Sequence, residues 1–459
     1  MPERRTCRLV TLGCKVNQYE TQYVKEALET AGWREADDDE PAGLCVVNTC
    51  TVTMEGDAKS RQIVRRLHQA NPGARIVVMG CYATRDPGAV GRLPGVNRVI
   101  TDKSRLAEEL RDFGVTRMPR GIKRFDGHQR AFVKVQDGCL LNCSYCIIPQ
   151  VRPRLRSRGP EEIAAEVRGL AERGCREIVL TGVHLGHYGV DLSRGLPKDG
   201  WCRLWHLLDR LESLAGDFRT RLSSLEAAEV RDDLVRAIAK SRRVVPHLHL
   251  CLQSGSDRIL ALMRRRYRAA GFLERCRRLR EALDQPAFTT DVIIGFPGET
   301  DRDFEQTCEV VRDVGFSRIH VFSYSPRAGT PAAGLGPPVA PGVVARRREH
   351  MRRLEKEQAV RYHQGLLGRR LEVLVEGADP HRRGRVLGTS CRYAPVSLPG
   401  HAPALTGQLV SVRAVGLDRS IVLGEPEPMD DAGFASAGAN HRRERIGLPL
   451  VNSHHGLHV

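Results

Sequence analysis

The chain has 459 residues, enough for about three domains that each have a hydrophobic core. It carries 72 Lys and Arg residues against 55 Asp and Glu residues, and this net charge of +17 favours nucleic acid as a partner. No run of about 20 apolar residues occurs and the start has no signal-peptide pattern, so we expect a cytoplasmic protein with no membrane partner. In a reducing compartment, its fourteen cysteines are expected to serve metal binding or catalysis rather than disulfides.

Residues 1–115 alternate between apolar segments and helical segments. Strands are expected at 7–12, 44–49 and 75–80, and helices at 17–31 and 55–69. Strands rich in Val and Ile that alternate with helices are typical of a parallel α/β domain, in which ligands bind at the carboxyl ends of the strands.

Each of these three strands is followed by a cysteine, namely Cys14, Cys50 and Cys81. Carboxyl ends of parallel strands meet at one edge of a sheet, so the three thiols are expected to lie together although they are far apart in the sequence. A buried cysteine is commonly just a small apolar side chain. Three cysteines in the same topological position favour a metal-cluster site over three unrelated apolar side chains.

A linker rich in Gly, Pro and basic residues is expected at 116–130, and a second domain at 131–365. About six strand-helix repeats follow the linker, and a long charged helix at 343–364 ends the domain. They include strands expected at 177–182 and 247–253 and helices expected at 232–240 and 301–314. This repetition predicts a partial or complete parallel barrel with its chemistry at the carboxyl ends of the strands.

The loop after the first strand of this second domain holds Cys139, Cys143 and Cys146, with the spacing C-x3-C-x2-C. Thiolates are soft ligands that select iron-sulfur clusters or zinc, and three of them can hold a cubic cluster with one metal corner open. A structural zinc ion requires a fourth ligand, and the nearest histidines, His128 and His184, are not at finger-like spacing. An open-cornered cluster is therefore favoured over a zinc knuckle or three buried thiols.

Short strands are expected from residue 366 on, at 371–375, 384–388, 408–412 and 420–423. Interleaved Gly, Pro and Asp turns predict a small β-barrel at 366–427 of the kind that binds nucleic acid. The segment 428–459 lacks periodicity and is expected to be disordered. Two arginine-rich runs, 152–158 and 264–268, are candidates for contacts with phosphates.

These motifs resemble the methylthiotransferase family of radical S-adenosylmethionine enzymes, and the resemblance runs from about residue 8 to about residue 425. The segments TLGCKVNQYE (11–20), LTGVHLG (180–186), SSLE (223–226) and LQSGS (252–256) are similar to the subgroup that acts on N6-threonylcarbamoyladenosine in tRNA. The segments NTCTVT (48–53), GCYA (80–83) and DVIIGFPGE (291–299) match the wider family.

The resemblance implies three domains: a flavodoxin-like parallel α/β domain, a radical S-adenosylmethionine partial (β/α)6 barrel, and a C-terminal OB-like TRAM barrel for RNA. It also implies two [4Fe-4S] clusters and S-adenosylmethionine as cofactors. One cluster would be held by Cys139, Cys143 and Cys146, with S-adenosylmethionine chelating its open iron. The auxiliary cluster would be held by Cys14, Cys50 and Cys81.

Contacts with S-adenosylmethionine are implied in the same way. Tyr145 would lie near the adenine, the Thr181-Gly182 segment near the methionyl end, and Ser224 and Gln253 near the ribose and the sulfonium. The strand from Asp291 to Gly295 would lie behind the adenine.

The implied reaction begins with reductive cleavage of S-adenosylmethionine to a radical that removes hydrogen from an unactivated aromatic carbon. The auxiliary cluster then delivers a methylated sulfur to C2 of threonylcarbamoyladenosine, next to the anticodon. The implied partners are tRNA and a reductase such as flavodoxin or ferredoxin. The oligomeric state and the source of the sulfur stay open.

Three alternatives stay open beside this function. A methylthiotransferase of the same fold could modify an aspartate of a ribosomal protein, although the basic composition and the 14–17 segment argue against it. Isopentenyladenosine in tRNA is another substrate within the family. In a different class, the chain could be a non-catalytic RNA-binding protein whose cysteines hold zinc.

Overall fold

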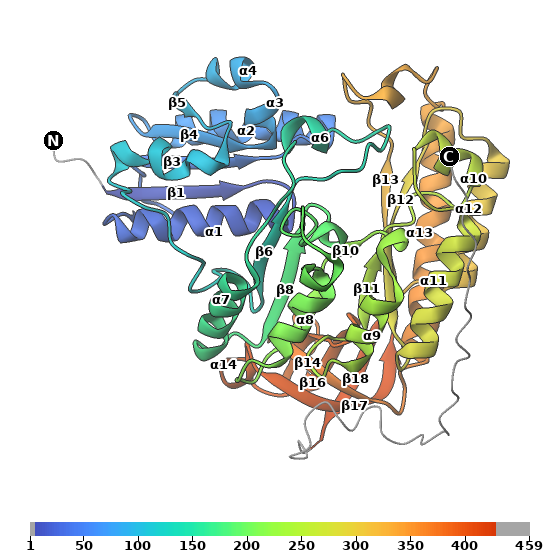
Figure 1. Cartoon of the computed structure of the whole chain (residues 1–459). Helices are drawn as coiled ribbons and strands as arrows, with labels where there is room; N and C mark the ends of the chain where they lie inside the picture. Colours follow the sequence, from blue (N-terminus) through green and yellow to red (C-terminus); the bar gives the residue numbers. More distant parts are fainter. Residues whose placement is uncertain (1–4, 428–459) are drawn as a thin grey trace.

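The computed structural model describes residues 5–427, so the tail expected at 428–459 lies outside the described residues. Three β-structures follow one another along the chain (Figure 1). A parallel sheet lies at one end, a partial barrel in the middle, and a closed β-barrel at the opposite end.

The first sheet has the strand order β2-β1-β3-β4-β5 and is parallel throughout. Its strands are β1 (Thr6–Thr11), β2 (Arg34–Glu35), β3 (Leu44–Thr49), β4 (Arg75–Gly80) and β5 (Val96–Val99). Its helices are α1 (Lys15–Thr30), α2 (Met54–Ala70), α3 (Cys81–Arg85), α4 (Pro87–Gly91) and α5 (Leu106–Glu109). This order is the flavodoxin-like one, and an apolar core lies on each face of the sheet. The expected fold class of this part is confirmed.

The central barrel consists of two four-stranded sheets, β7-β6-β8-β9 and β10-β11-β12-β13, whose long strands are parallel. Its strands are β6 (Ala131–Asp137), β7 (Arg156–Ser157), β8 (Glu177–Gly182), β9 (Arg219–Leu222), β10 (Ser224–Leu225), β11 (His247–Leu250), β12 (Ala287–Ile294) and β13 (Arg318–Ser323). The expected strand 247–253 ends at Leu250, and Gln253, with a φ of 62°, rejoins the sheet through an isolated parallel bridge to Val292.

The helices of the central domain are α6 (Ile148–Val151), α7 (Pro160–Glu172), α8 (Leu204–Glu212), α9 (Asp232–Lys240), α10 (Asp257–Leu262), α11 (Ala269–Ala282), α12 (Asp301–Val314) and α13 (Pro341–Gln364). Most of them cover the outside of the barrel, whereas α6 packs against α3 of the first domain (Figure 1). Their limits follow from local signals. In α12, Thr300 and Asp303 form a capping box, and Gly315 ends the helix in the left-handed conformation. Alternating strands and helices therefore build the partial barrel that the sequence predicts.

The C-terminal barrel is closed in the order β14-β15-β16-β18-β17. Its elements are β14 (Arg370–Ala378), β15 (Arg385–Ser390), β16 (Pro395–Pro399), α14 (Ala402–Leu405), β17 (Leu409–Asp418) and β18 (Ile421–Pro426). The small all-β barrel is confirmed, but the sequence analysis missed β16. That strand begins and ends with proline, a residue depleted in strands, and it exists because β15 and β18 pair with it.

Buried arginines join the C-terminal barrel to the amino ends of the central strands. Arg219 donates to the carbonyl oxygens of Glu372 (2.8 Å) and Thr389 (3.0 Å), and Arg221 donates to that of Ser390 (3.1 Å). The carboxylate of Glu177, fully buried, accepts from both guanidinium groups. The closed barrel thus docks at the end of the central barrel opposite the cysteines.

Within residues 5–427, none of the helices is both long and apolar enough to cross a membrane.

Candidate functional site

The carboxyl edge of the first sheet brings together Cys14, Cys50 and Cys81. Cys14 is the N-cap of α1, Cys50 directly follows β3, and Cys81 begins α3. Burial raises the pKa of the Cys50 thiol to about 11, and the charges of Cys81 and Cys14 act in the same direction, so the three groups lie within electrostatic range. Gly13 makes room for this arrangement, because a Cβ at that position would lie 2.9 Å from the sulfur of Cys50.

The loop after β6 brings together Cys139, Cys143 and Cys146. Burial raises the pKa of Cys146 to about 12, and Cys143 and Cys139 contribute in the same direction. Gly138 begins the loop with a φ of 76°, and a Cβ there would lie 2.1 Å from the carbonyl oxygen of Arg154. The loop can therefore follow this path only with glycine at that position.

The two cysteine groups lie on elements that pack against each other. Cys81 belongs to a small apolar cluster with Ile147, the residue after Cys146, and Val151, which lies four residues further along the chain. Arg152, the next residue, places its Nε 3.4 Å from the sulfur of Cys81. The segment that leaves one cysteine group therefore contacts the other.

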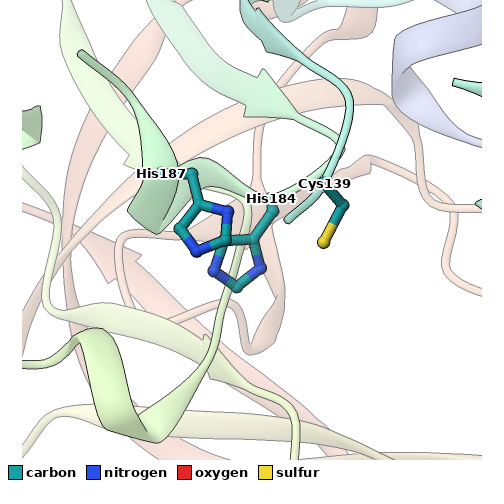
Figure 2. Close-up of side chains that lie close together, drawn as sticks. All are labelled: Cys139, His184 and His187. Atoms are coloured by element: carbon teal, nitrogen blue, oxygen red, sulfur yellow. The ribbon is translucent and has the colours of Figure 1, made fainter. Parts of the chain in front are cut away.

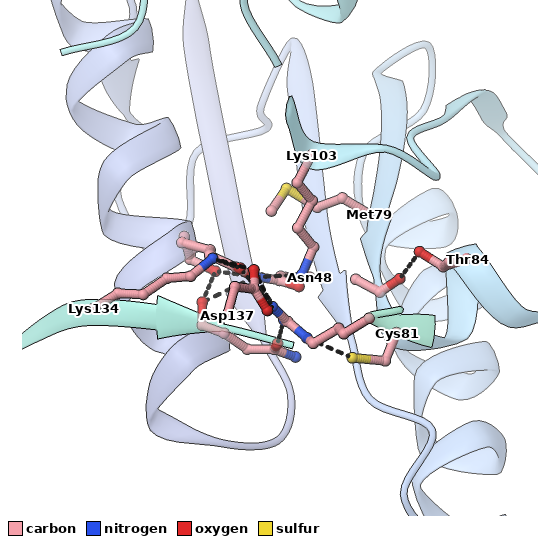
Figure 3. A network of polar contacts seen from close by, with 12 residues as sticks. Asn48, Met79, Cys81, Thr84, Lys103, Lys134 and Asp137 are labelled. Carbon is pink, nitrogen blue, oxygen red and sulfur yellow. Dashed lines mark hydrogen bonds and ion pairs between the residues drawn. The ribbon is translucent and has the colours of Figure 1, made fainter. Parts of the chain in front are cut away.

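Arg152 is the centre of a buried set of charges that we call the Arg152 cluster, formed with Asn17, Glu20, Lys103, Lys134 and Asp137 (Figure 3). Its guanidinium donates to Glu20 (2.9 and 3.0 Å), Asp137 (2.7 Å) and Asn17 (2.9 Å). Burial alone would raise the pKa of Glu20, but Arg152, Lys103 and Lys134 hold it well below its usual range. The cluster fixes the first sheet relative to the start of the central barrel.

The sequence analysis named residues 152–158 as candidates for phosphate contacts, and the structure pairs two of its arginines with groups inside the protein. Arg152 is buried in the cluster just described, and Arg158 donates to Glu166 and Tyr19. Arg154 and Arg156 are exposed. The arginines divide between buried and exposed positions because the segment runs along the domain junction, which its composition does not reveal.

The second arginine-rich run, 264–268, also contains both inward-facing and exposed arginines. Arg265 is turned inward, with its Nη1 3.3 Å from the sulfur of Cys143, whereas Arg264, Arg266 and Arg268 are exposed. A guanidinium beside a thiolate lowers the cost of a negative cluster. The sequence analysis missed this role because nothing in the run distinguishes Arg265 from its neighbours.

Two histidines, His184 and His187, lie beside the loop cysteines (Figure 2). One ring nitrogen of each histidine and the sulfur of Cys139 lie within 4.8 Å of one another. Burial lowers the pKa of His184 to about 3 and that of His187 to about 4, so both rings are neutral at neutral pH. The sequence spacing argued against a histidine near these cysteines, and tertiary structure brings both rings there.

The residues expected to contact S-adenosylmethionine surround the same loop. Tyr145 packs edge-on against Phe296, with ring centroids 6.4 Å apart. Thr181 and Gly182 end β8, and a Cβ at Gly182 would lie 2.8 Å from an oxygen of Gln136. Their positions at the carboxyl ends of barrel strands are those where ligands of such barrels bind.

The other expected contacts lie on the second sheet of the central barrel. Ser224 is in β10, while Gln253 bridges to β12 through Asp291 and Ile293 (2.8 and 2.9 Å). Gly295 has a φ of 77° and donates its N–H to Glu299 (2.9 Å). Asp291 points instead at His249, with Oδ1 3.4 Å from Nε2.

Neither carboxylate oxygen of Glu226, two residues after Ser224, has a hydrogen-bond partner among the described residues, although both are buried. The nearest cation is Arg265, 3.7 Å away. Buried polar atoms without partners are what a polar ligand would satisfy. These two unpaired oxygens beside three convergent thiols fit an iron-sulfur cluster with a polar cofactor on its open corner.

Comparison with known proteins first defines the class. Residues 133–311 match the Radical SAM superfamily, and residues 6–101 match the Uncharacterized protein family UPF0004. The fold is similar to that of the radical S-adenosylmethionine methyltransferase TsrM from Kitasatospora setae, solved with cobalamin and a [4Fe-4S] cluster bound. That likeness has a TM-score of 0.54 and covers 72% of this chain and 77% of the other at 15% identity. The chain is a radical S-adenosylmethionine protein.

Curated relatives then define the family. The threonylcarbamoyladenosine tRNA methylthiotransferase MtaB of Chlamydia pneumoniae is 39% identical over 92% of this chain and 98% of its own length. The MtaB protein of Bacillus subtilis is 37% identical over 88% of this chain and 92% of its own length. A tRNA-2-methylthio-N(6)-dimethylallyladenosine synthase of Desulfitobacterium hafniense is 35% identical over 88% of this chain and 94% of its own length. The chain belongs to the methylthiotransferase family of radical S-adenosylmethionine enzymes, which use S-adenosylmethionine and [4Fe-4S] clusters.

Proposed function

We propose that this protein transfers a methylthio group to C2 of N6-threonylcarbamoyladenosine next to the anticodon of tRNA. The carrying observation is the packing of two three-cysteine groups on adjoining elements, with Arg152 between them. The relatives of greatest listed identity act on this nucleoside by name, and they span almost the whole chain. A substrate base between the two groups would be within reach of both.

The first group, Cys139, Cys143 and Cys146, would hold the cluster that binds S-adenosylmethionine, and Arg265 would balance its charge. The second group, Cys14, Cys50 and Cys81, would hold the auxiliary cluster beside Arg152. When bound, these cofactors supply a carbon-centred radical that removes hydrogen from the base, and a sulfur that replaces it.

The chain's own residues would orient these partners. Tyr145, Thr181, Gly182, Ser224, Gln253, Asp291 and Gly295 would line the S-adenosylmethionine site. The Arg152 cluster would hold the two domains in register, so that the substrate carbon faces both cofactors. The proposal includes the division of the chain into an auxiliary-cluster domain at 1–115, a linker at 116–130, a radical S-adenosylmethionine domain at 131–365 and an RNA-binding domain at 366–427.

The partner would be the anticodon stem-loop of tRNA, bound by the exposed arginines and the C-terminal barrel. Arg154, Arg156, Arg264, Arg266 and Arg268 are exposed near the cysteines. Such side chains suit phosphate contacts, which a net charge of +17 strengthens. A reductase such as flavodoxin or ferredoxin would supply electrons, and the setting would be the cytoplasm.

One observation favours a second candidate, a zinc-containing RNA-binding protein. Cys139, His184 and His187 together offer one thiolate and two imidazoles, ligands that zinc accepts. Anaerobic reconstitution followed by metal and sulfide analysis separates the two. Iron with labile sulfide supports the enzyme, while zinc without sulfide supports the binding protein.

The decisive experiment is the nucleoside profile of tRNA from a strain that lacks this gene. Loss of the methylthio mark from threonylcarbamoyladenosine, restored by the wild-type gene but not by a Cys143→Ala variant, is the expected result. An unchanged profile would contradict the proposed substrate. Loss of the mark from isopentenyladenosine instead would assign the chain to the other branch of the family.

A further inference from the structure

Lys15 directly follows Cys14 and is the first residue of α1. Its side chain is exposed and forms no hydrogen bond or ion pair within the part of the chain that the structure describes. The basic residues nearby are different, since Lys103, Lys134 and Arg152 are all paired with carboxylates. Lys15 therefore keeps its full charge available to a ligand.

This charge faces the central barrel. Helix α1 packs against β6 and β8, and the carboxyl end of β1 points toward the side of the barrel that β12 and β13 form (Figure 1). Burial lowers the pKa of His320 in β13, and the charge of Lys15 contributes in the same direction. The charge of Lys15 also acts on Asp291 in β12, so the lysine lies within electrostatic range of both strands.

The barrel wall opposite Lys15 does not cancel its charge. Asp291 is a carboxylate on that wall, and it pairs with His249, whose Nε2 lies 3.4 Å from its Oδ1. Burial alone would lower the pKa of His249, but Cys251 and Asp291 raise it to about 10, so the imidazole is charged at neutral pH. Because Asp291 is already paired with His249, Lys15 has no ion-pair partner on this wall among the described residues.

One exposed aromatic side chain lies on the strand next to the same space. Phe322 is on the same face of β13 as His320, two residues away, and its side chain is exposed. The loop after Cys50 reaches this end of β13, because Met54 donates its N–H to Ser325 (3.2 Å) and Arg327 donates to Asp57 (2.6 Å). An exposed aromatic ring near a free cation suits a nucleobase that carries an anionic substituent.

We propose that Lys15 determines substrate specificity by binding the carboxylate of the threonyl group in N6-threonylcarbamoyladenosine. The inference rests on the proposed function and adds a residue to it. The threonyl group ends in a carboxylate, whereas a dimethylallyl group has neither charge nor hydrogen-bonding atoms. An ammonium group beside Cys14 would hold the modified base close to the auxiliary cysteines.

The test compares two anticodon stem-loop RNAs on the reconstituted enzyme, one with threonylcarbamoyladenosine and one with its threonyl carboxylate converted to a carboxamide. For wild type, kcat/KM for methylthiolation is expected to be about 10- to 100-fold lower on the carboxamide RNA, as for a lost charge-assisted hydrogen bond. Lys15→Met should lower kcat/KM on the carboxylate RNA by a similar factor, mainly through KM, and change it little on the carboxamide RNA. Lys15→Arg should retain most of the preference for the carboxylate.

The matched control is Lys123→Met, which removes an exposed lysine charge in the segment before the central barrel and should change neither value. Iron and sulfide content, and S-adenosylmethionine cleavage without RNA, should be equal in wild type and Lys15→Met. If Lys15→Met lowers kcat/KM equally on both RNAs, or cleaves less S-adenosylmethionine than wild type without RNA, the inference is overturned. A wild-type enzyme that modifies both RNAs equally would overturn it while leaving the proposed function intact. A wild type that modifies only isopentenyladenosine RNA would overturn both.

Discussion

Arg152 donates two hydrogen bonds to the carboxylate of Glu20, at 2.9 and 3.0 Å, and thereby links the start of the central barrel to helix α1 of the first sheet. The same guanidinium lies beside the sulfur of Cys81. One side chain therefore contacts an element of each domain and one of the proposed cluster ligands. Its substitution should affect stability and the auxiliary site together.

Arg152→Met should destabilise the protein by about 3–5 kcal/mol, because it leaves the buried carboxylates of Glu20 and Asp137 without their main partner. Chemical unfolding of the protein without iron measures this difference. Arg154→Met, two residues along at an exposed position, is the control and should change stability by less than about 0.5 kcal/mol. Equal stabilities for the two variants would contradict a role of Arg152 in the domain junction.

Replacing either cysteine group with alanine should remove about half of the iron and sulfide and abolish methylthiolation, because each group would hold its own cluster. The measurement is iron and sulfide content after anaerobic reconstitution of the two triple variants, one at Cys14, Cys50 and Cys81 and one at Cys139, Cys143 and Cys146. The control is Cys45→Ala, which alters a fully buried cysteine of β3 in the core of the first domain. Loss of iron from the control as large as that from the triple variants would argue against the assignment.

Gly138→Ala should displace the loop that holds Cys139 and lower its iron content. The new Cβ would lie 2.1 Å from a backbone carbonyl oxygen, and the φ of 76° disfavours any side chain. Gly127→Ala is the control that separates the steric clash from the unfavourable φ. Gly127 has a φ of 73°, but a Cβ there would have nothing within 4 Å. The control should lose only about 1–2 kcal/mol of stability and keep all its iron. Full iron in Gly138→Ala would show that the loop tolerates the change.

Glu177→Gln should destabilise the protein at pH 7 by about 3–5 kcal/mol, because Arg219 and Arg221 stay buried without their carboxylate. Burial alone would raise the pKa of Glu177, but Arg221, Arg219 and Arg130 hold it well below its usual range. The unfolded carboxyl titrates near about pH 4.3. The stabilisation is therefore complete above about pH 5 and is lost as the pH falls below the unfolded pKa.

Unfolding of the iron-free protein at several pH values checks this prediction, with the difference between wild type and Glu177→Gln shrinking below about pH 4. The control is Glu357→Gln on the exposed surface of α13, which should show no such dependence. A difference that stays constant down to pH 3 would mean that the charge of Glu177 does not stabilise the junction.

Much of the fold follows from local pattern. The strands 44–49, 75–80 and 177–182 and the helices 232–240 and 301–314 lie where the sequence analysis expected them. Val- and Ile-rich runs and capping residues determine such elements at short range. Strand β16 was missed because its pairing with β15 and β18 outweighs its two prolines, an effect that acts between segments distant in sequence.

The candidate site also has a part that the sequence predicts and a part that only the tertiary structure determines. Motif and spacing alone singled out Cys14, Cys50, Cys81 and the loop from Cys139 to Cys146, because ligand type and position after a strand are properties of the sequence. The inward turn of Arg152 and Arg265, the approach of His184 to Cys139 and the free charge of Lys15 were decided by tertiary structure. Burial and ion pairing depend on which surfaces meet when domains pack, and identical arginines in one run can then become a buried anchor or an exposed contact.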